Sequence, residues 1–206
     1  PTRRSSDLIF EDINDDGLKD LVVAGWGLKE SEEADHTGGV YIYNGGTDWQ
    51  KGPAETLFGT KDSQFGSVVK LVKIEDKTLL GVIATNEGKN GTIYFYDPSA
   101  MTEKFTVTVP ATLDMGSNGG FSDFDTISNG TETILVAGGK YFKDGGRILC
   151  AAITPESAEE LVECSWQPET TTGGFGYSVK NAGNIDAEGG DELVVGMPEY
   201  IHTVTE

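Results

Sequence analysis

The loop Asp12–Asp20 carries oxygen atoms at the spacing that a calcium-binding loop requires. Ca²⁺ takes about six to eight oxygen ligands, and alternating side chains on a tightly wound loop can surround it. Gly17 permits the sharp turn that such a loop contains. The sequence therefore predicts a calcium site whose ligands are the side chains of Asp12, Asn14, Asp16 and Asp20 and the main-chain carbonyl of Leu18.

A solvated acidic turn and an EF-hand are the two alternatives for this loop. An acidic turn formed by chance would seldom match every ligand position with the glycine in place. An EF-hand loop begins in the same way but has a glutamate at its twelfth position, where this chain has Val23. An EF-hand also lies between two helices, whereas Asp20 runs directly into the apolar run Leu21–Ala24. We therefore expect the loop to belong to a β-hairpin.

A second segment, Asn184–Glu192, repeats the same spacing of oxygen ligands 172 residues later. Its first residue is Asn where the first loop has Asp, and its fifth is Glu where the first loop has Asp, so we expect weaker binding. The corresponding segments 74–77 and 126–131 lack the ligand set, and we predict no metal there. The predicted ligands of the second site are Asn184, Asp186, Glu188, the carbonyl of Gly190, and Glu192.

Four short apolar runs divide the chain into repeating units. Their terminal small residues follow one another at intervals of 60, 53 and 59 residues. A glycine turn and an alternating strand follow each of the first three runs, and a Phe-Gly segment precedes two of the runs, at Phe65–Val69 and Phe175–Val179. No segment has the pattern of a helix of any length. The four runs are Leu21–Ala24, Gly81–Ala84, Ile134–Ala137 and Leu193–Gly196.

Four-stranded units that repeat at this period are typical of the blades of a β-propeller, because each blade buries its faces only against its neighbours. An array of β-sandwiches is the competing fold, but its period would be nearer to about 100 residues. We predict an all-β fold, a β-propeller of four-stranded blades, of which about three and a half are present. The predicted units are 9–57, 58–112, 113–168 and 169–206.

The combination of Phe-Gly-x-x-Val, an acidic loop and the segment Glu192–Gly196 followed by Pro198 resembles the FG-GAP repeat. This repeat forms the propellers of integrin α-subunits and of many bacterial surface and secreted proteins. The resemblance extends from about Ile9 to Pro198, strongly in the first and last units and weakly in the two middle units. It implies a seven-bladed ring to which this chain contributes a part, and a ligand-binding face opposite the calcium loops.

The charge of the chain excludes two classes of partner. Lys and Arg number 15 against 34 Asp and Glu, for a formal net charge of −19. A polyanion of this size repels phosphate backbones and anionic lipid head groups, so we expect no binding to nucleic acid or to a membrane surface. No apolar run approaches the roughly 18 residues of a membrane span, which predicts no insertion.

The opening segment, residues 1–8, is unlike the rest of the chain. It contains Arg3 and Arg4, two of only three arginines in 206 residues. It resembles a translated sequencing adapter, as seen at the ends of assembled metagenomic fragments, and an ordinary exposed basic terminus is the alternative. We expect a non-native or disordered leader outside the fold.

The two cysteines, Cys150 and Cys164, lie in two expected strands whose hairpin has its midpoint at Ser157. That midpoint places the two residues directly opposite each other across the hairpin, where a disulfide can form. Two buried free thiols are the alternative, which a reducing compartment would favour.

The sequence favours a binding protein over an enzyme. The two histidines, His36 and His202, lie outside any recognisable nucleophile motif, and no pair of carboxylates is singled out as a glycosidase site. We predict a calcium-stabilised propeller, extracellular, cell-surface or periplasmic, that acts as a binding or adhesion module. Its protein or glycan ligand is expected opposite the calcium loops, at segments 26–38 and 140–142, which as an alternative are only solvated loops. The other functional hypothesis is a non-catalytic propeller attached to a secreted hydrolase.

Overall fold

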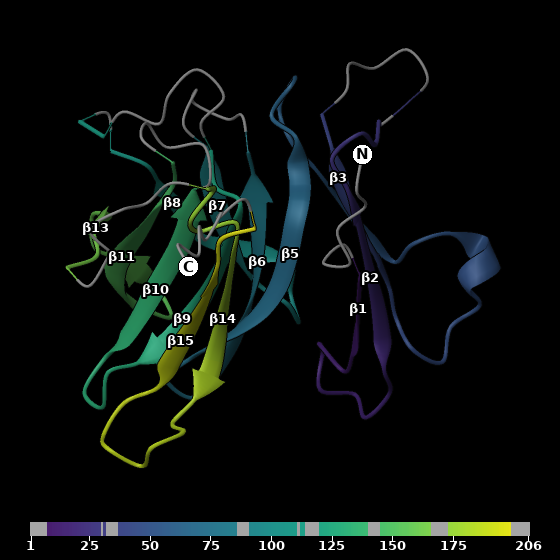
Figure 1. Ribbon diagram of the computed structural model, residues 1–206. Helices are drawn as coiled ribbons and strands as arrows, with labels where there is room; N and C mark the ends of the chain where they lie inside the picture. Colours follow the sequence, from purple (N-terminus) through teal and green to yellow (C-terminus); the bar gives the residue numbers. More distant parts are fainter. Residues whose placement is uncertain are drawn as a thin grey trace, which may run out of the picture.

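Antiparallel sheets joined by turns make up the protein, as a computed structural model shows (Figure 1). The structure describes residues 8–29, 31, 37–85, 91–110, 112–113, 120–139, 145–165 and 173–198. Within these ranges there are four antiparallel sheets and one short 3₁₀ helix, η1 (Trp49–Lys51). The all-β class is therefore confirmed. These residues do not form a closed ring, so the propeller remains a prediction.

Each sheet follows the order of the chain. The first sheet consists of β1 (Leu8–Glu11), β2 (Asp20–Gly25), β3 (Gly39–Tyr43) and β4 (Glu55–Phe58). The second consists of β5 (Phe65–Ile74), β6 (Lys77–Ala84), β7 (Thr92–Asp97) and β8 (Thr102–Thr108). The third consists of β9 (Asp123–Ser128), β10 (Thr133–Gly139), β11 (Arg147–Thr154) and β12 (Ser157–Ala158), with β13 (Val162–Glu163) also paired to β11. In the fourth, β14 (Ser178–Gly183) pairs with β15 (Glu192–Gly196).

The apolar runs predicted from the sequence form the second strand of each sheet. Val, Ile and Leu favour the pleated surface, and the second strand lies between two neighbours in the first three sheets. The run Gly81–Ala84 is buried throughout, whereas burial alternates along β2. The first strand of the first sheet begins at Leu8, which pairs with Val23. Leu8, the last residue of the expected leader, therefore belongs to the first sheet, and residues 1–7 lie outside the described residues.

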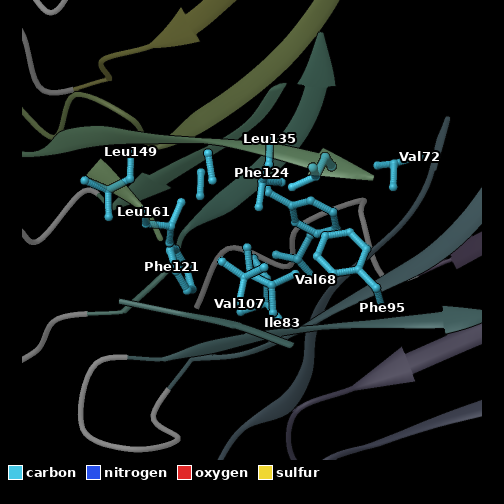
Figure 2. Packing of buried hydrophobic residues seen from close by; sticks show 14 of the residues in the cluster. Val68, Val72, Ile83, Phe95, Val107, Phe121, Phe124, Leu135, Leu149 and Leu161 are labelled. Carbon is cyan, nitrogen blue, oxygen red and sulfur yellow. The ribbon is translucent and has the colours of Figure 1, made fainter. Parts of the chain in front are cut away.

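Hydrophobic clusters join each sheet to the next. The largest cluster lies between the second and third sheets, where Phe124 packs edge-on against Phe95 with 6.0 Å between the ring centroids (Figure 2). The ring of Phe124 also lies over Gly81, where any Cβ would clash with it. A second cluster joins the first and second sheets, and a third joins the third and fourth. The first strands β5, β9 and β14 therefore lie beside one another (Figure 1).

The Phe-Gly segments lie where one sheet meets the next. Phe65 bridges to Gly38 of the first sheet, and Phe175 bridges in the same way to Gly146 of the third. Both glycines have positive φ, and a Cβ on either would clash with the carbonyl oxygen of the phenylalanine. The expected strand Phe65–Val69 is part of β5, but β14 begins only at Ser178. The Phe-Gly pair therefore acts as a close backbone contact between sheets.

The two cysteines form a disulfide, with 5.3 Å between their Cα atoms. The predicted register is wrong, however, because Cys150 pairs with Val162 and the main-chain N–H of Cys164 donates to Ile148. The disulfide therefore crosses the β11–β13 pair diagonally. Closing a loop of this length stabilises a fold by about 3 kcal/mol.

Candidate metal centre

The first predicted loop joins β1 to β2. These two strands are antiparallel, and Glu11 lies opposite Asp20 at the end of the pair. In the described residues both flanking elements are strands, which confirms a β-hairpin and excludes the two helices of an EF-hand. The loop extends toward the lower side of the molecule in the view of Figure 1.

Side-chain oxygens of this loop accept hydrogen bonds from the loop's own main-chain N–H groups, and these bonds hold its tight turn. The N–H of Gly17 donates to Asp12 (2.8 Å), that of Asp16 donates to Asn14 (3.0 Å), and that of Leu18 donates to Asp16 (2.8 Å). These bonds hold the oxygens of Asp12, Asn14 and Asp16 close to the loop backbone. Three of the four side chains predicted as ligands are thus part of one compact turn.

Asp20 is the buried member of the predicted ligand set, with no exposed surface. Its Oδ2 accepts the N–H of Ile13 (3.0 Å), and its Oδ1 accepts the N–H of Gly45 (2.7 Å), which lies between β3 and β4. Both donors are neutral, although a buried carboxylate is most stable beside a cation. Asp20 therefore joins the loop to the body of its own sheet.

The second predicted loop joins β14 to β15 and has the same winding. Ala187 and Gly189 have φ of 64° and 93°, and the matching residues of the first loop, Asp15 and Gly17, have φ of 60° and 85°. A left-handed alanine is uncommon, so its presence shows how closely the loop follows one conformation. The N–H of Ile185 donates to Glu192, just as the N–H of Ile13 donates to Asp20.

The second loop is more exposed than the first. Glu192 is only partly buried, and Asn184, Asp186 and Glu188 are exposed. Asp186 accepts the N–H of Glu188 (2.8 Å), as Asn14 does that of Asp16 in the first loop. Gly190 lies against the third sheet, where a Cβ would approach the carbonyl oxygen of Ser128 to 3.2 Å. A neighbouring sheet therefore helps to place this loop.

The donor chemistry of both loops fits calcium, because every predicted ligand is an oxygen. In the described residues, no three or more His, Cys, Asp or Glu side chains are grouped so as to hold a metal ion. The carboxylates of each loop therefore do not converge in this conformation. Binding would require them to turn inward and exchange some loop N–H partners for the cation.

A cavity of about 390 Å³ lies beside the first loop, between the first and second sheets, and four aspartates and two lysines line it. Asp12 and Asp15 line one side of it, and Asp97 lies at the end of β7 on another side. The hydroxyl of Ser99 donates to Asp97 (2.7 Å), and this hydrogen bond holds the pKa of the Asp97 carboxyl below its usual value. Asp97 is therefore ionised at neutral pH and adds to the negative charge next to the loop.

Sequence reasoning missed one residue of the second loop. Asp191 occupies the eighth position of the loop, which is not among the predicted ligand positions. The structure shows its carboxylate accepting the N–H of Ser128 on the third sheet (2.8 Å). The only signal in the sequence is the contrast with Lys19, the residue at the same position in the first loop.

The expected ligand-binding face is described only in part. Trp26 follows β2 and is 58% exposed. All four acidic residues of segment 26–38, and the whole of segment 140–142, lie outside the described residues.

Comparisons with known proteins provide information on the fold of the chain and none on its function. No family model and no curated protein matches the chain. Among solved structures it is similar to the rhamnogalacturonan lyase PL11 of Bacillus licheniformis, with 12% identity and a TM-score of 0.55. The match covers 92% of this chain and 39% of the lyase, so this chain spans about two fifths of that protein. At this identity the likeness is one of fold alone.

Proposed function

We propose that this chain is part of a calcium-stabilised, extracellular β-propeller that acts as a binding or adhesion module. The observation that carries the proposal is the shared winding of the loops Asp12–Asp20 and Asn184–Glu192, including left-handed residues at the same two positions. Two loops 172 residues apart have left-handed residues at the same two positions and oxygen-bearing ligands at the same positions. Calcium ligation is the chemistry for which this pattern is suited.

The role proposed for the metal is structural. When bound, calcium would supply the positive charge that the acidic loops lack. Asp12, Asn14 and Asp16 would hold it from within the turn, and the carbonyl of Leu18 would add a main-chain oxygen. Asp20 would connect the site to the sheet, because its carboxylate already contacts Gly45. A cation that binds only the folded state raises the free energy of unfolding by mass action.

The disulfide supports the extracellular part of the proposal. Disulfides persist in secreted, cell-surface and periplasmic proteins, and Cys150 and Cys164 form one. Extracellular modules bind calcium with dissociation constants of about 10⁻⁴–10⁻³ M. No helix among the described residues is long and apolar enough to cross a membrane.

Thermal melting with calcium and with a chelator tests the metal sites. At a tenfold excess over the dissociation constant, each site should add about 1.4 kcal/mol, which raises the melting midpoint by about 4 °C. Asp16→Ala should remove the contribution of the first loop. Asp15→Asn is the matched control, since it removes a charge from the same turn but keeps the predicted ligands and tolerates positive φ. If calcium left the melting midpoint of the unsubstituted chain unchanged, the proposed metal sites would be wrong.

The binding role is tested separately. A screen of glycans and proteins against the chain should identify a ligand whose binding falls when Trp26 is replaced by Ala, because exposed aromatic side chains often anchor recognition. Trp49→Ala is the control, since Trp49 is also exposed but lies between β3 and β4, on the side of the calcium loops. Equal loss in both variants would argue against a ligand on the opposite face.

The second candidate is a non-catalytic propeller within a larger secreted hydrolase. One observation favours keeping it, namely that the chain matches about two fifths of an enzyme. Sequencing the complete gene separates the two candidates, because an attached catalytic domain would be visible beside this one.

A further inference from the structure

The second loop is bonded to the neighbouring third sheet through Asp191. The main-chain N–H of Asp191 donates to the carbonyl of Ser128 (2.7 Å), and the N–H of Ser128 donates to the Asp191 carboxylate (2.8 Å). In the first loop the same position is Lys19, whose Nζ lies 3.4 Å from Glu11 in its own sheet. That ion pair is largely exposed and adds little stability.

Asn181 strengthens the connection at the same end of the sheets. Its side-chain amide donates to the Asp191 carboxylate (3.0 Å) and to the carbonyl of Thr126 (2.8 Å). Its main-chain N–H donates to the buried carboxylate of Asp125 (3.0 Å), which lies 3.0 Å from the ammonium group of Lys180. The carboxylate of Asp191 thus belongs to a hydrogen-bonded network that spans β9 and β14.

The same kind of bonding continues to the other end of the two strands. Asp123 accepts the N–H of Val179 (2.9 Å) and lies 2.8 Å from Lys70 of β5. Lys70 also donates to the carbonyl of Val179 (3.1 Å), so it links the second sheet, to which it belongs, with the third and the fourth. We call this row of contacts between β9 and β14 the polar seam; its side chains come from Lys70, Asp123, Asp125, Asn181 and Asp191.

We propose that Asp191 is a positioning residue that couples cation binding by the second loop to the docking of the fourth sheet on the third. Asp191 lies directly between Gly190 and Glu192, two of the predicted ligands. Holding both neighbours on a cation restricts the backbone of Asp191 and so favours its two bonds to Ser128. By thermodynamic reciprocity, a closed polar seam raises the affinity of the loop for the cation by the same factor. This inference rests on the proposed function.

Amide hydrogen exchange of the 206-residue chain tests this coupling, with calcium chloride against a chelator. Calcium should slow exchange at the amide of Ser128 in the natural chain. Asp191→Ala should speed that exchange about tenfold, as expected for losing a hydrogen bond to a charged acceptor, and should abolish the effect of calcium on it. Lys19→Ala, at the matching position, should leave exchange at Ser128 unchanged.

A conservative variant separates positioning from general destabilisation. Asp191→Asn keeps an oxygen that can accept the N–H of Ser128, so it should retain most of the protection and the calcium response. Equal exchange at Ser128 in Asp191→Ala and the natural chain would overturn the coupling. So would calcium-independent exchange at Ser128 in a chain whose melting midpoint still rises with calcium, and that result would leave the proposed function standing. A midpoint that does not respond to calcium would overturn both.

Discussion

The two acidic loops share a backbone conformation but are anchored to different parts of the molecule. Asp20 ties the first loop to Gly45 within its own sheet. Asp191 ties the second loop to Ser128 on the neighbouring sheet. The comparison teaches that one local motif can be anchored in two ways: the first loop is held by its own sheet, while the second loop is held by the neighbouring sheet.

The largest difference is expected at the ninth position of the loops. Asp20→Ala should lower the free energy of unfolding by about 3 kcal/mol in chelator, because two buried N–H groups lose their acceptor. Glu192→Ala should cost about 1 kcal/mol, since Glu192 is only partly buried. Urea denaturation of both variants measures the contrast. Equal losses would show that Asp20 is no more deeply anchored than its counterpart.

Gly45 offers a way to break the first anchor without changing a predicted ligand. A Cβ there would lie 2.6 Å from the carbonyl oxygen of Lys19 and 2.7 Å from the Cβ of Leu18. Gly45→Ala should therefore destabilise the chain by about 2 kcal/mol through overpacking. Gly27→Ala is the control, because a Cβ at Gly27 has no neighbour within 4 Å. If both variants have the same melting midpoint, the close contact between Gly45 and the loop contributes little to the stability of the chain.

The weaker affinity predicted for the second loop can be sharpened by giving it the residues of the first. In an Asp16→Ala background, the double change Asn184→Asp and Glu188→Asp should raise calcium affinity about tenfold, because it adds one charge and shortens the fifth ligand. Calorimetric titration measures the change. Gln50→Glu adds the same charge outside the loop and should leave the affinity nearly unchanged; an equal gain there would point to net charge alone.

The smallest effect concerns the left-handed fourth position. Ala187→Asp should stabilise the chain and Asp15→Ala should destabilise it, each by about 1 kcal/mol, because aspartate tolerates positive φ better than alanine. Chemical denaturation in the presence of a chelator and high salt measures the conformational effect of the substitution alone, because metal binding is removed and charge interactions are screened. If Ala187→Asp and Asp15→Ala both stabilised the chain, or both destabilised it, the result would contradict a shared left-handed conformation at this position.

Much of the fold could be predicted from the sequence because its signals are local. The apolar runs and glycine turns predicted strands that the structure contains, and the hairpin position of the first loop is confirmed by the pairing of β1 with β2. The register of the disulfide hairpin could not be predicted, because the pairing shifts along it and Cys150 lies opposite Val162. The FG-GAP family, the calcium ligands and the closed propeller remain predictions.

The sequence by itself determined how each acidic loop winds, because every bond in the turn joins residues at most seven positions apart, such as Ile13 and Asp20. Only the tertiary structure decided what each loop is attached to. The contact from Asp20 to Gly45 spans 25 residues, and that from Asp191 to Ser128 spans 63. Contacts of that range depend on how whole sheets pack. The residues of one loop therefore do not determine which residue elsewhere in the chain the loop will contact.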